Sequence, residues 1–305
     1  MEKIIGRFAP SPSGVMHLGN ILSFLLSWLD ARSCNGEVVF RMEDLDPDRS
    51  KAEYAKKIAD DLKWLGLDWD RGWDEEHPEY AQSHRNDLYD DAFSLLLNNN
   101  CVYPCYCTRS QRLAASAPHP GEDNGAYACR CRYLTQSQRL ALEAEGRKPS
   151  WKLCAPERFL SFCDLHYGSV SESAGEDFII RRSDGVYAYQ LAVSVDDIDM
   201  GIRRVVRGRD LLSSTPKQIW LIKELGAVPP EYCHTPLLVS EDQRKLSKRY
   251  GDLSMDVLRE KHSPEEIIGH LAYLLGLTPD EPVSAKELLS VFSWDKIPTE
   301  DILLK

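Results

Sequence analysis

Two short segments at opposite ends of the 305-residue chain carry residues suited to phosphate chemistry. The first is His17-Leu-Gly-Asn20, which follows a turn rich in Pro, Ser and Gly. The second is Lys245-Leu-Ser-Lys-Arg249, which holds two ammonium groups three positions apart. From Leu18 onward the apolar residues recur at helical spacing, so the first segment forms the first turn of a predicted helix. Unpaired N–H groups and the positive end of the helix dipole attract phosphate there.

The elements around the first segment predict a parallel sheet. Ile4, Ile5 and Phe8 indicate a strand before the turn, and Glu37–Glu43 indicates a second strand after the helix. This β–α–β unit predicts an α/β fold with a doubly wound parallel sheet. Ligands of such sheets bind beyond the carboxyl ends of the strands. Glu43, at the end of the second strand, is therefore expected to face the same pocket as Arg7 and Ser11.

The later part of the chain shows further periodic segments. We expect helices over residues 80–97 and after Ser213-Ser-Thr-Pro216, where a hydroxyl cap precedes a proline in the first turn. Other segments are expected to be strands or turns. The expected strands are Phe178–Arg181, Val186–Val193 and Arg204–Arg207, and the expected turn is Asp196–Gly201.

Composition changes divide the chain into four predicted units. Residues 1–100 are expected to be the first half of a nucleotide-binding domain, and residues 101–175, with most of the nine cysteines, an insertion. Residues 176–255 are expected to complete the domain and to carry the lysine segment. Residues 256–305 predict a small C-terminal helical unit.

The cysteine spacing in the insertion is typical of a structural zinc site. Cys105-Tyr-Cys107 is followed, after a polar loop, by Cys129-Arg-Cys131. Pairs of thiolates separated in this way hold zinc in many small domains. Ligand chemistry favours Cys129 as a fourth ligand, and Cys101 competes with it. Free buried thiols are the alternative interpretation.

Charge and composition narrow the class of protein. The net charge of −11 argues against a non-specific nucleic-acid binder, which would be basic overall, but allows RNA to bind a local patch. No apolar run has membrane-spanning length and no signal segment follows Met1, so we expect a cytoplasmic protein that binds no membrane. No GxGxxG or GxxxxGK[ST] run is present, which disfavours dehydrogenases and P-loop ATPases.

The two phosphate segments resemble the HIGH and KMSKS signatures of class I aminoacyl-tRNA synthetases. The opening Arg7-Phe-Ala-Pro-Ser-Pro-Ser-Gly14 is similar to the glutamyl branch of that family. The resemblance covers nearly the whole chain. It implies a Rossmann-like catalytic domain that binds ATP with Mg²⁺ and uses it to activate an amino acid as its adenylate, with release of pyrophosphate. The residues implied in catalysis are His17, Gly19, Asn20, Lys245, Ser247 and Lys248, of which His17, Gly19, Asn20 and Lys248 would contact ATP.

A pocket for glutamate needs both guanidinium and carboxylate groups, because glutamate carries two carboxylates and one ammonium. Arg7 offers a forked grip, Glu43 suits the α-ammonium, and Ser11 and the backbone of Ala9 can add hydrogen bonds. The resemblance to the glutamyl branch adds two residues by position. These are Tyr189 and Arg207. Many full-length glutamyl enzymes have Asn four residues after that Tyr, where this chain has Val193, so one polar contact is expected to be lost.

The same resemblance implies a zinc ligand set different from the one that ligand chemistry favours. In the glutamyl branch a Cys-x-Cys pair meets a Tyr-x-x-x-Cys, which selects Cys105, Cys107, Tyr127 and Cys131. A site filled by four protein groups holds structure and does not perform the chemistry.

The chain is similar in length to shortened members of the glutamyl branch. We expect no anticodon-binding region, because none fits after the C-terminal unit. Those members activate L-glutamate with ATP without tRNA and transfer it onto queuosine at the wobble position of tRNA(Asp). This is the expected function, with a monomer as the expected state. The alternatives are a compact glutamyl-tRNA synthetase that charges the 3′ end of tRNA(Glu), and an inactive RNA-binding paralogue.

Overall fold

A computed structural model describes residues 3–107, 129–156, 159–173, 177–239 and 253–304. The α-helices within these residues are α1 (Leu18–Ser33), α2 (Ala52–Trp64), α3 (Asn86–Asn98), α5 (Gln136–Ala144), α6 (Tyr189–Asp199), α7 (Thr215–Glu224), α8 (Met255–Lys261), α9 (Pro264–Leu274) and α10 (Ala285–Leu288). The strands are β1 (Ile5–Phe8), β2 (Glu37–Phe40), β3 (Arg71–Gly72), β4 (Val102–Cys105), β5 (Ser150–Leu153), β6 (Phe159–Asp164), β7 (Gly168–Ser173), β8 (Phe178–Arg181), β9 (Arg204–Gly208), β10 (Glu231–Thr235), β11 (Leu238–Val239) and β12 (Ile302–Leu303).

The parallel strands at the centre of the molecule confirm the predicted fold class. β1 pairs with β2 in parallel, and β2 pairs with β3. On the other side, β9 pairs in parallel with β10, and β10 with β6. β9 lies beside β1, because the Arg203 N–H donates to the Ile5 carbonyl at 2.8 Å. The strand order therefore reverses between β1 and β9, which makes their carboxyl ends the expected ligand site.

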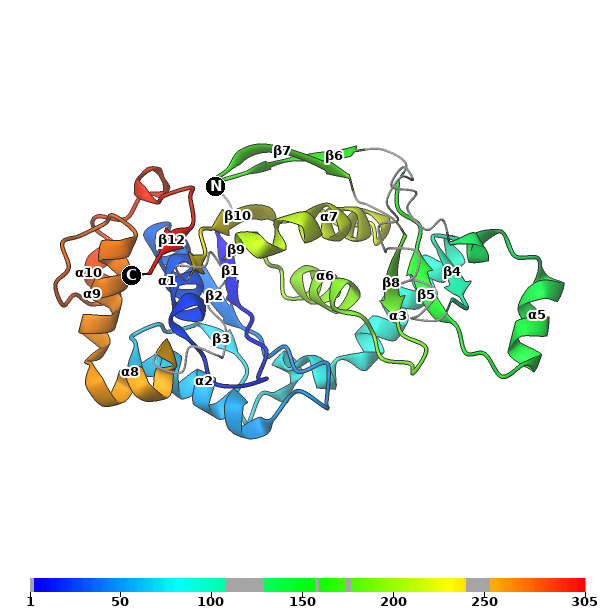
Figure 1. Cartoon of the computed structure of the whole chain (residues 1–305), viewed down its shortest axis with the longest axis horizontal. Coiled ribbons are helices and arrows are strands. Elements are labelled where there is room, and N and C mark those ends of the chain that lie inside the picture. The colour runs from blue at the N-terminus through cyan, green and yellow to red at the C-terminus, as the bar shows by residue number, and fades with distance from the viewer. Residues whose placement is uncertain (1–2, 108–128, 157–158, 174–176, 240–252, 305) are drawn as a thin grey trace, which may run out of the picture.

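The layers around these strands bury a large core. Helix α1 presents Leu18, Ile21, Leu22, Leu25 and Leu29 to it, as their helical spacing predicts. Figure 1 places α5 at one end of the molecule and α8, α9 and α10 at the opposite end, with the parallel strands between them. Within the described residues, no helix is long and apolar enough to cross a membrane.

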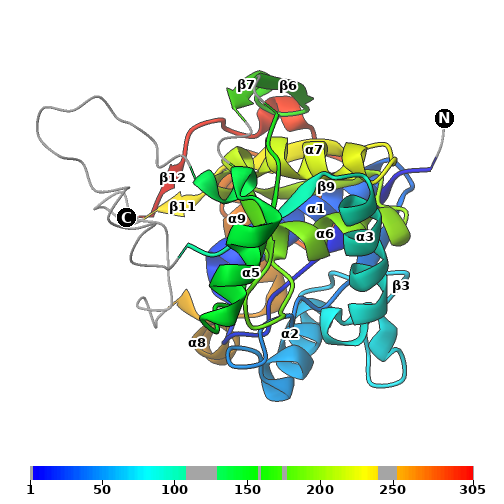
Figure 2. The same ribbon diagram turned by 90° about the vertical axis from the view of Figure 1, so that its right-hand side faces the viewer.

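The segment predicted as an insertion contributes to two sheets. Strands β4, β5 and β8 form an antiparallel sheet of their own. The β6–β7 hairpin instead joins the sheet of β9 and β10, and Figures 1 and 2 both show it lying over α7. Residues before position 175 thus reach the central sheet. The domain boundaries stay a prediction.

The strand predicted over Val186–Val193 is wrong, as is the turn predicted over Asp196–Gly201. Both segments contribute to helix α6, which begins at Tyr189 and ends at Asp199. Valine and tyrosine favour strands only weakly, and packing overrides that preference. Leu191, Ala192 and Val195 lie on one helical face and pack into the apolar cluster around Tyr89 and Phe93. The helix that the sequence predicts over residues 80–97 begins later than expected, at Asn86.

Candidate active site

A cavity of about 690 Å³ opens where β1 and β9 end, at the reversal of strand order. Residues predicted for two separate tasks line it together. From the predicted glutamate set it contains Arg7, Ala9, Ser11, Glu43, Tyr189 and Arg207, and from the predicted ATP set His17, Gly19 and Asn20. A cavity lined by both sets is suited to hold a small anionic molecule beside a nucleotide.

The His17–Asn20 segment forms the start of helix α1, as predicted. His17 is the residue before the helix, and the Asn20 side-chain oxygen accepts a 3.0 Å hydrogen bond from the His17 backbone N–H. This reciprocal cap fixes the Asn20 carboxamide, and its NH₂ group is the part left to donate to a ligand. A side chain at Gly19 would press against the His17 ring, since a Cβ there lies 3.2 Å from two ring atoms.

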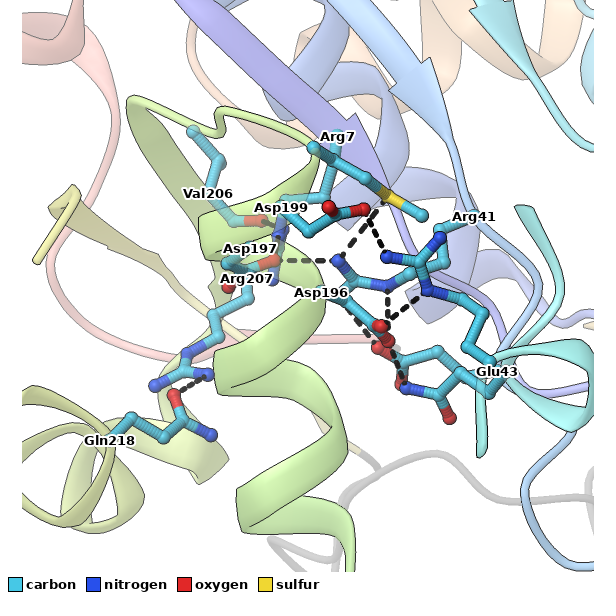
Figure 3. A network of polar contacts seen from close by, with 12 residues as sticks. Arg7, Arg41, Glu43, Asp196, Asp197, Asp199, Val206, Arg207 and Gln218 are labelled. Carbon is cyan, nitrogen blue, oxygen red and sulfur yellow. Dashed lines mark hydrogen bonds and ion pairs between the residues drawn. The ribbon is translucent and has the colours of Figure 1, made fainter. Parts of the chain in front are cut away.

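A buried network of charges surrounds Arg7 and Glu43, which both line the cavity (Figure 3). Arg41 is fully buried and donates to Glu43 at 3.0 Å and to Asp197 at 2.7 Å. The Arg7 Nε lies 4.0 Å from the same Asp197 carboxylate, and an Arg7 Nη1 hydrogen is donated to the Val206 carbonyl at 2.8 Å. Opposite charges held this close offset part of the cost of removing each group from water.

The pKa values of this network show whether burial or neighbouring charge dominates at each group. Burial lowers the pKa of Arg7 and raises the pKa of Glu43. Burial also opposes the charge of Arg41, but Asp197, Asp196 and Glu43 together raise its pKa well above the ordinary value. Arg41 is thus the fixed positive charge that the surrounding carboxylates require.

Arg207 is held entirely by neutral groups. Its Nη1 donates to the Gln218 side chain at 2.7 Å, its Nη2 to Thr215 Oγ1 at 2.8 Å, and its Nε to a ring nitrogen of His234 at 3.2 Å. Within the described part of the chain, no carboxylate lies within ion-pair distance of this guanidinium. Its positive charge is therefore available for an anionic ligand in the cavity.

Tyr189 begins helix α6 and faces the same cavity. Burial raises the pKa of its phenol, with the charge of Glu43 as the next cause, so the hydroxyl stays protonated and can donate a hydrogen bond. Val193 lies one helical turn further on and is buried, and it is not among the residues that line the cavity. An apolar residue at this position supplies no polar contact to a ligand.

The lysine segment with Lys245, Ser247 and Lys248 lies outside the described residues. The residues on both sides of it are described. Before the segment, Leu237 and Leu238 line the cavity. After it, Ser254 pairs with His17 and the Met255 N–H donates to the Met16 carbonyl at 2.9 Å. The chain therefore leaves for this segment, and returns from it, next to the cavity.

Four thiols gather at the end of β4 and could hold a metal ion. They belong to Cys105, Cys107, Cys129 and Cys131, whose sulfur atoms all lie within 4.8 Å of one another. Sulfur separations of 3.4, 3.5 and 3.7 Å among them approach the roughly 3.8 Å expected for a tetrahedron with Zn–S bonds of about 2.3 Å. Burial raises the pKa of the Cys131 thiol to about 11, although the Tyr106 backbone N–H donates to it, and a bound cation would favour its thiolate. The donor set therefore fits zinc.

The fourth member of this cluster is Cys129, the residue that ligand chemistry favoured. Tyr127, which the family resemblance implied, lies outside the described residues. Cys101 does not belong to the cluster, since its thiol lies 2.8 Å from Glu224.

Several residues that shape the cavity were missed from the sequence. Arg41, Asp197, Asp164 and His234 do not line it, but they hold the residues that do. A signal for Arg41 was available, because residues 41 and 43 at a strand end project to the same side. The interpretation of Asp196–Gly201 as a turn concealed the role of Asp197.

Comparison with known proteins identifies the class to which this fold and cavity belong. The model of the catalytic domain of class I tRNA synthetases for glutamate and glutamine (E and Q) matches residues 3–299. The chain therefore belongs to this family and is a ligase.

Within the family, the chain is similar to two proteins named glutamyl-Q tRNA(Asp) synthetase. It is 47% identical to the proteins of that name from Nitratidesulfovibrio vulgaris and Symbiobacterium thermophilum, covering 98% of this chain and 95% of each relative. It is also 39% identical to the glutamate–tRNA ligase of Aquifex aeolicus, over 96% of this chain but 62% of that enzyme. A crystal structure of a glutamate–tRNA ligase from Elizabethkingia meningosepticum, with its amino acid, matches with a TM-score of 0.84 and 26% identity, covering all of this chain and 67% of the other.

Proposed function

We propose that the chain activates L-glutamate with ATP in the absence of RNA and transfers it onto queuosine of tRNA(Asp). The observation that carries the first half is that the guanidiniums of Arg7 and Arg207 and the carboxylate of Glu43 line a single cavity. Arg7 and Arg207 would bind the carboxylates of glutamate, and Glu43 would bind its ammonium. Tyr189, Ser11 and the backbone of Ala9 would complete the polar contacts.

The proposed activation step joins the substrate carboxylate to the α-phosphorus of ATP. A new O–P bond forms as the bond between the α-phosphorus and pyrophosphate breaks, which yields glutamyl-adenylate. His17 and Asn20 would donate hydrogen bonds to phosphate oxygens, and Gly19 would let the nucleotide approach the backbone. Lys245, Ser247 and Lys248 would stabilise the departing pyrophosphate, with Mg²⁺ accompanying ATP. An oxygen nucleophile of the RNA would then displace AMP from the adenylate.

The choice of RNA rests on the relatives rather than on the cavity. Two relatives covered over 95% of their length bear the name glutamyl-Q tRNA(Asp) synthetase. The second candidate is a glutamyl-tRNA synthetase that charges tRNA(Glu), which the likeness to glutamate–tRNA ligases supports. Zinc at the four-thiol cluster would be structural in either enzyme. The cytoplasmic location and the monomeric state stay predictions.

Two assays test this proposal. ATP–pyrophosphate exchange with glutamate, measured without RNA, distinguishes an enzyme that activates glutamate alone from one that needs RNA and from an inactive paralogue. Transfer of labelled glutamate is then measured on tRNA(Asp) with queuosine, on tRNA(Asp) without it, and on tRNA(Glu). Transfer only to the modified tRNA(Asp) is expected. Labelling of tRNA(Glu) would instead support the second candidate.

A further inference from the structure

A line of hydrogen bonds crosses three neighbouring strands behind the cavity. Asp164 ends β6, His234 lies in β10, and Arg207 lies opposite His234 in β9. The Asp164 carboxylate lies 2.6 Å from His234 Nδ1, and His234 Nε2 lies 3.2 Å from Arg207 Nε. All three side chains are buried. The line connects the β6–β7 hairpin to a guanidinium that faces the cavity.

The arrangement determines which nitrogen of His234 carries the proton. An arginine side chain is always protonated, so Arg207 Nε can only donate. His234 Nε2 must then be the unprotonated acceptor, and Nδ1 carries the hydrogen that is donated to Asp164. Asp164 is itself fixed, because its other oxygen accepts backbone hydrogen bonds from His166 at 3.0 Å and Tyr167 at 2.9 Å.

The ring of His234 is neutral at pH 7. Burial lowers its pKa, and the charges of Arg207 and Arg7 act in the same direction, against the opposing hydrogen bond to Asp164. A neutral acceptor orients Arg207 without cancelling its charge. A carboxylate in the same place would orient the guanidinium equally well but would neutralise it before the substrate arrives.

The rest of the Arg207 environment follows the same rule. Gln218 and Thr215 accept from its two terminal nitrogens at 2.7 and 2.8 Å. The Tyr232 ring lies 5.2 Å from its central carbon, in a cation–π contact. Each of these groups is uncharged, and together with His234 they fix the plane of the guanidinium.

We propose that His234, held in its Nδ1-protonated tautomer by Asp164, is a positioning residue that presents Arg207 to the carboxylate of the substrate. This proposal rests on the proposed function, which makes glutamate the ligand of Arg207. His234 does not touch the substrate itself. It acts by removing the rotational freedom of the guanidinium before glutamate binds, which lowers the entropy cost of binding.

The tautomer can be measured directly in the unaltered protein. Long-range ¹H–¹⁵N NMR spectra of histidine-labelled protein distinguish a protonated Nδ1 from a protonated Nε2, and a His234→Asn variant assigns the signal among the eight histidines. We expect His234 to be protonated at Nδ1 at neutral pH, although free histidine prefers Nε2. Protonation at Nε2 would overturn the proposal, because that nitrogen could not accept from Arg207.

A pair of substitutions then tests the effect on glutamate. His234→Asn keeps a donor near the position of Nδ1 but removes the acceptor for Arg207, whereas His234→Gln places an oxygen near the position of Nε2. We expect the Kd of glutamate, measured by calorimetry, to rise about 10–100-fold in the Asn variant, by analogy with the loss found for partners that orient metal-binding residues. The Gln variant should recover much of this loss. The KM for ATP should change little in both variants.

Cys233→Ala is the matched control, because Cys233 is the buried neighbour of His234 and packs into the core on the other face of the strand. It should lower stability without weakening glutamate binding. Unchanged glutamate affinity in the Asn variant would overturn the proposal, as would equal losses in the Asn and Gln variants. If the unaltered protein bound no glutamate, the proposed function would fail as well, and the tautomer measurement would still decide the contact between His234 and Arg207.

Discussion

Arg41 and Glu43 form a buried ion pair at the end of β2, with the Arg41 Nη2 atom 3.0 Å from a Glu43 carboxylate oxygen. The Arg41 side chain is fully buried and the Glu43 side chain is 8% exposed. Burial nevertheless raises the pKa of Glu43, so the desolvation of its carboxylate exceeds the stabilisation that Arg41 and Arg7 provide. The charge of Glu43 is thus kept at a cost to the stability of the fold.

Glu43→Gln is therefore expected to leave the free energy of unfolding at pH 7 unchanged or to raise it. A carboxyl group whose pKa is raised in the folded state contributes stability below its unfolded pKa, and this contribution is lost as pH rises. The amide of the variant does not ionise, so this loss of stability does not occur, and its oxygen can still accept a hydrogen bond from Arg41. The same change should raise the KM for glutamate about 10²-fold, because the substrate ammonium loses its charged partner. Urea unfolding at pH 4 and pH 7 and exchange kinetics measure the two effects.

The pH dependence of glutamate binding provides the result that could contradict this role of Glu43. In the unaltered protein, glutamate affinity should fall as pH drops through the raised pKa of Glu43, and this acid limb should disappear in Glu43→Gln. An unchanged acid limb would show that another group titrates.

Arg41→Met should destabilise the fold by about 3–5 kcal/mol, since it leaves buried carboxylates without their shared cation. Asp197 loses a 2.7 Å partner and Glu43 loses its 3.0 Å partner. Urea denaturation measures the change. Arg182→Met is the control, because Arg182 pairs with Asp184 on the surface and both are about half exposed. The control should lose less than about 1 kcal/mol. Equal losses would contradict the central position of Arg41.

The sequence predicts the first half of the fold better than the second, for a physical reason. Helix α1 has an unbroken apolar stripe and clear boundaries, so its extent follows from spacing alone. Helix α6 has valines and a tyrosine at its start and three aspartates near its end, which locally favour a strand and a turn. Only its packing against the cluster around Tyr89, and the salt bridges of its aspartates to Arg41 and Arg85, determine that it is helical.

The candidate site shows the same division. Charge requirements and family resemblance predict Arg7, Glu43 and Arg207 as ligands of glutamate, and all three line the cavity. The groups that orient them were not, since Asp197 and His234 are brought to Arg7 and Arg207 only by the pairing and packing of distant segments. No local pattern marks a buried histidine as an acceptor for arginine. Contacts across more than a hundred residues, such as Arg41 with Asp197, need the sheet to be known first.

Arg207→Lys should raise the KM for glutamate about 10²-fold or more and leave the KM for ATP nearly unchanged. Lysine retains the charge but cannot donate to His234, Gln218 and Thr215 in one plane, so it loses its fixed direction. Arg204→Lys, on the same strand, is the control. Arg204 binds Asp30 and Glu231 rather than the cavity, so the glutamate KM should stay as it is. Parallel rises in both KM values would place Arg207 outside the glutamate pocket.

Cys129→Ser should lower the zinc content measured by mass spectrometry and the melting temperature, because it removes one of four sulfur ligands. Cys154→Ser is the matched control, as Cys154 packs near the cluster without belonging to it. Tyr127→Phe tests the alternative ligand set that the family resemblance implies. Full zinc content in Cys129→Ser together with a loss in Tyr127→Phe would show that the phenol, and not the fourth thiol, completes the site.

Lys248→Ala should reduce ATP–pyrophosphate exchange about 10²–10³-fold, which corresponds to roughly 2–4 kcal/mol of lost transition-state stabilisation. The lysine would stabilise the charge that develops on pyrophosphate as it leaves. The residues on either side of the lysine segment lie at the cavity, since Leu237 and Leu238 line it and Ser254 pairs with His17. Lys245→Ala should have a smaller effect. Lys261→Ala, at the end of α8, is the control for loss of a lysine charge outside the cavity. Thermal unfolding should be the same for all three variants. Undiminished exchange in Lys248→Ala would remove this lysine from the mechanism, whereas a matching loss in Lys261→Ala would point to a general effect of charge.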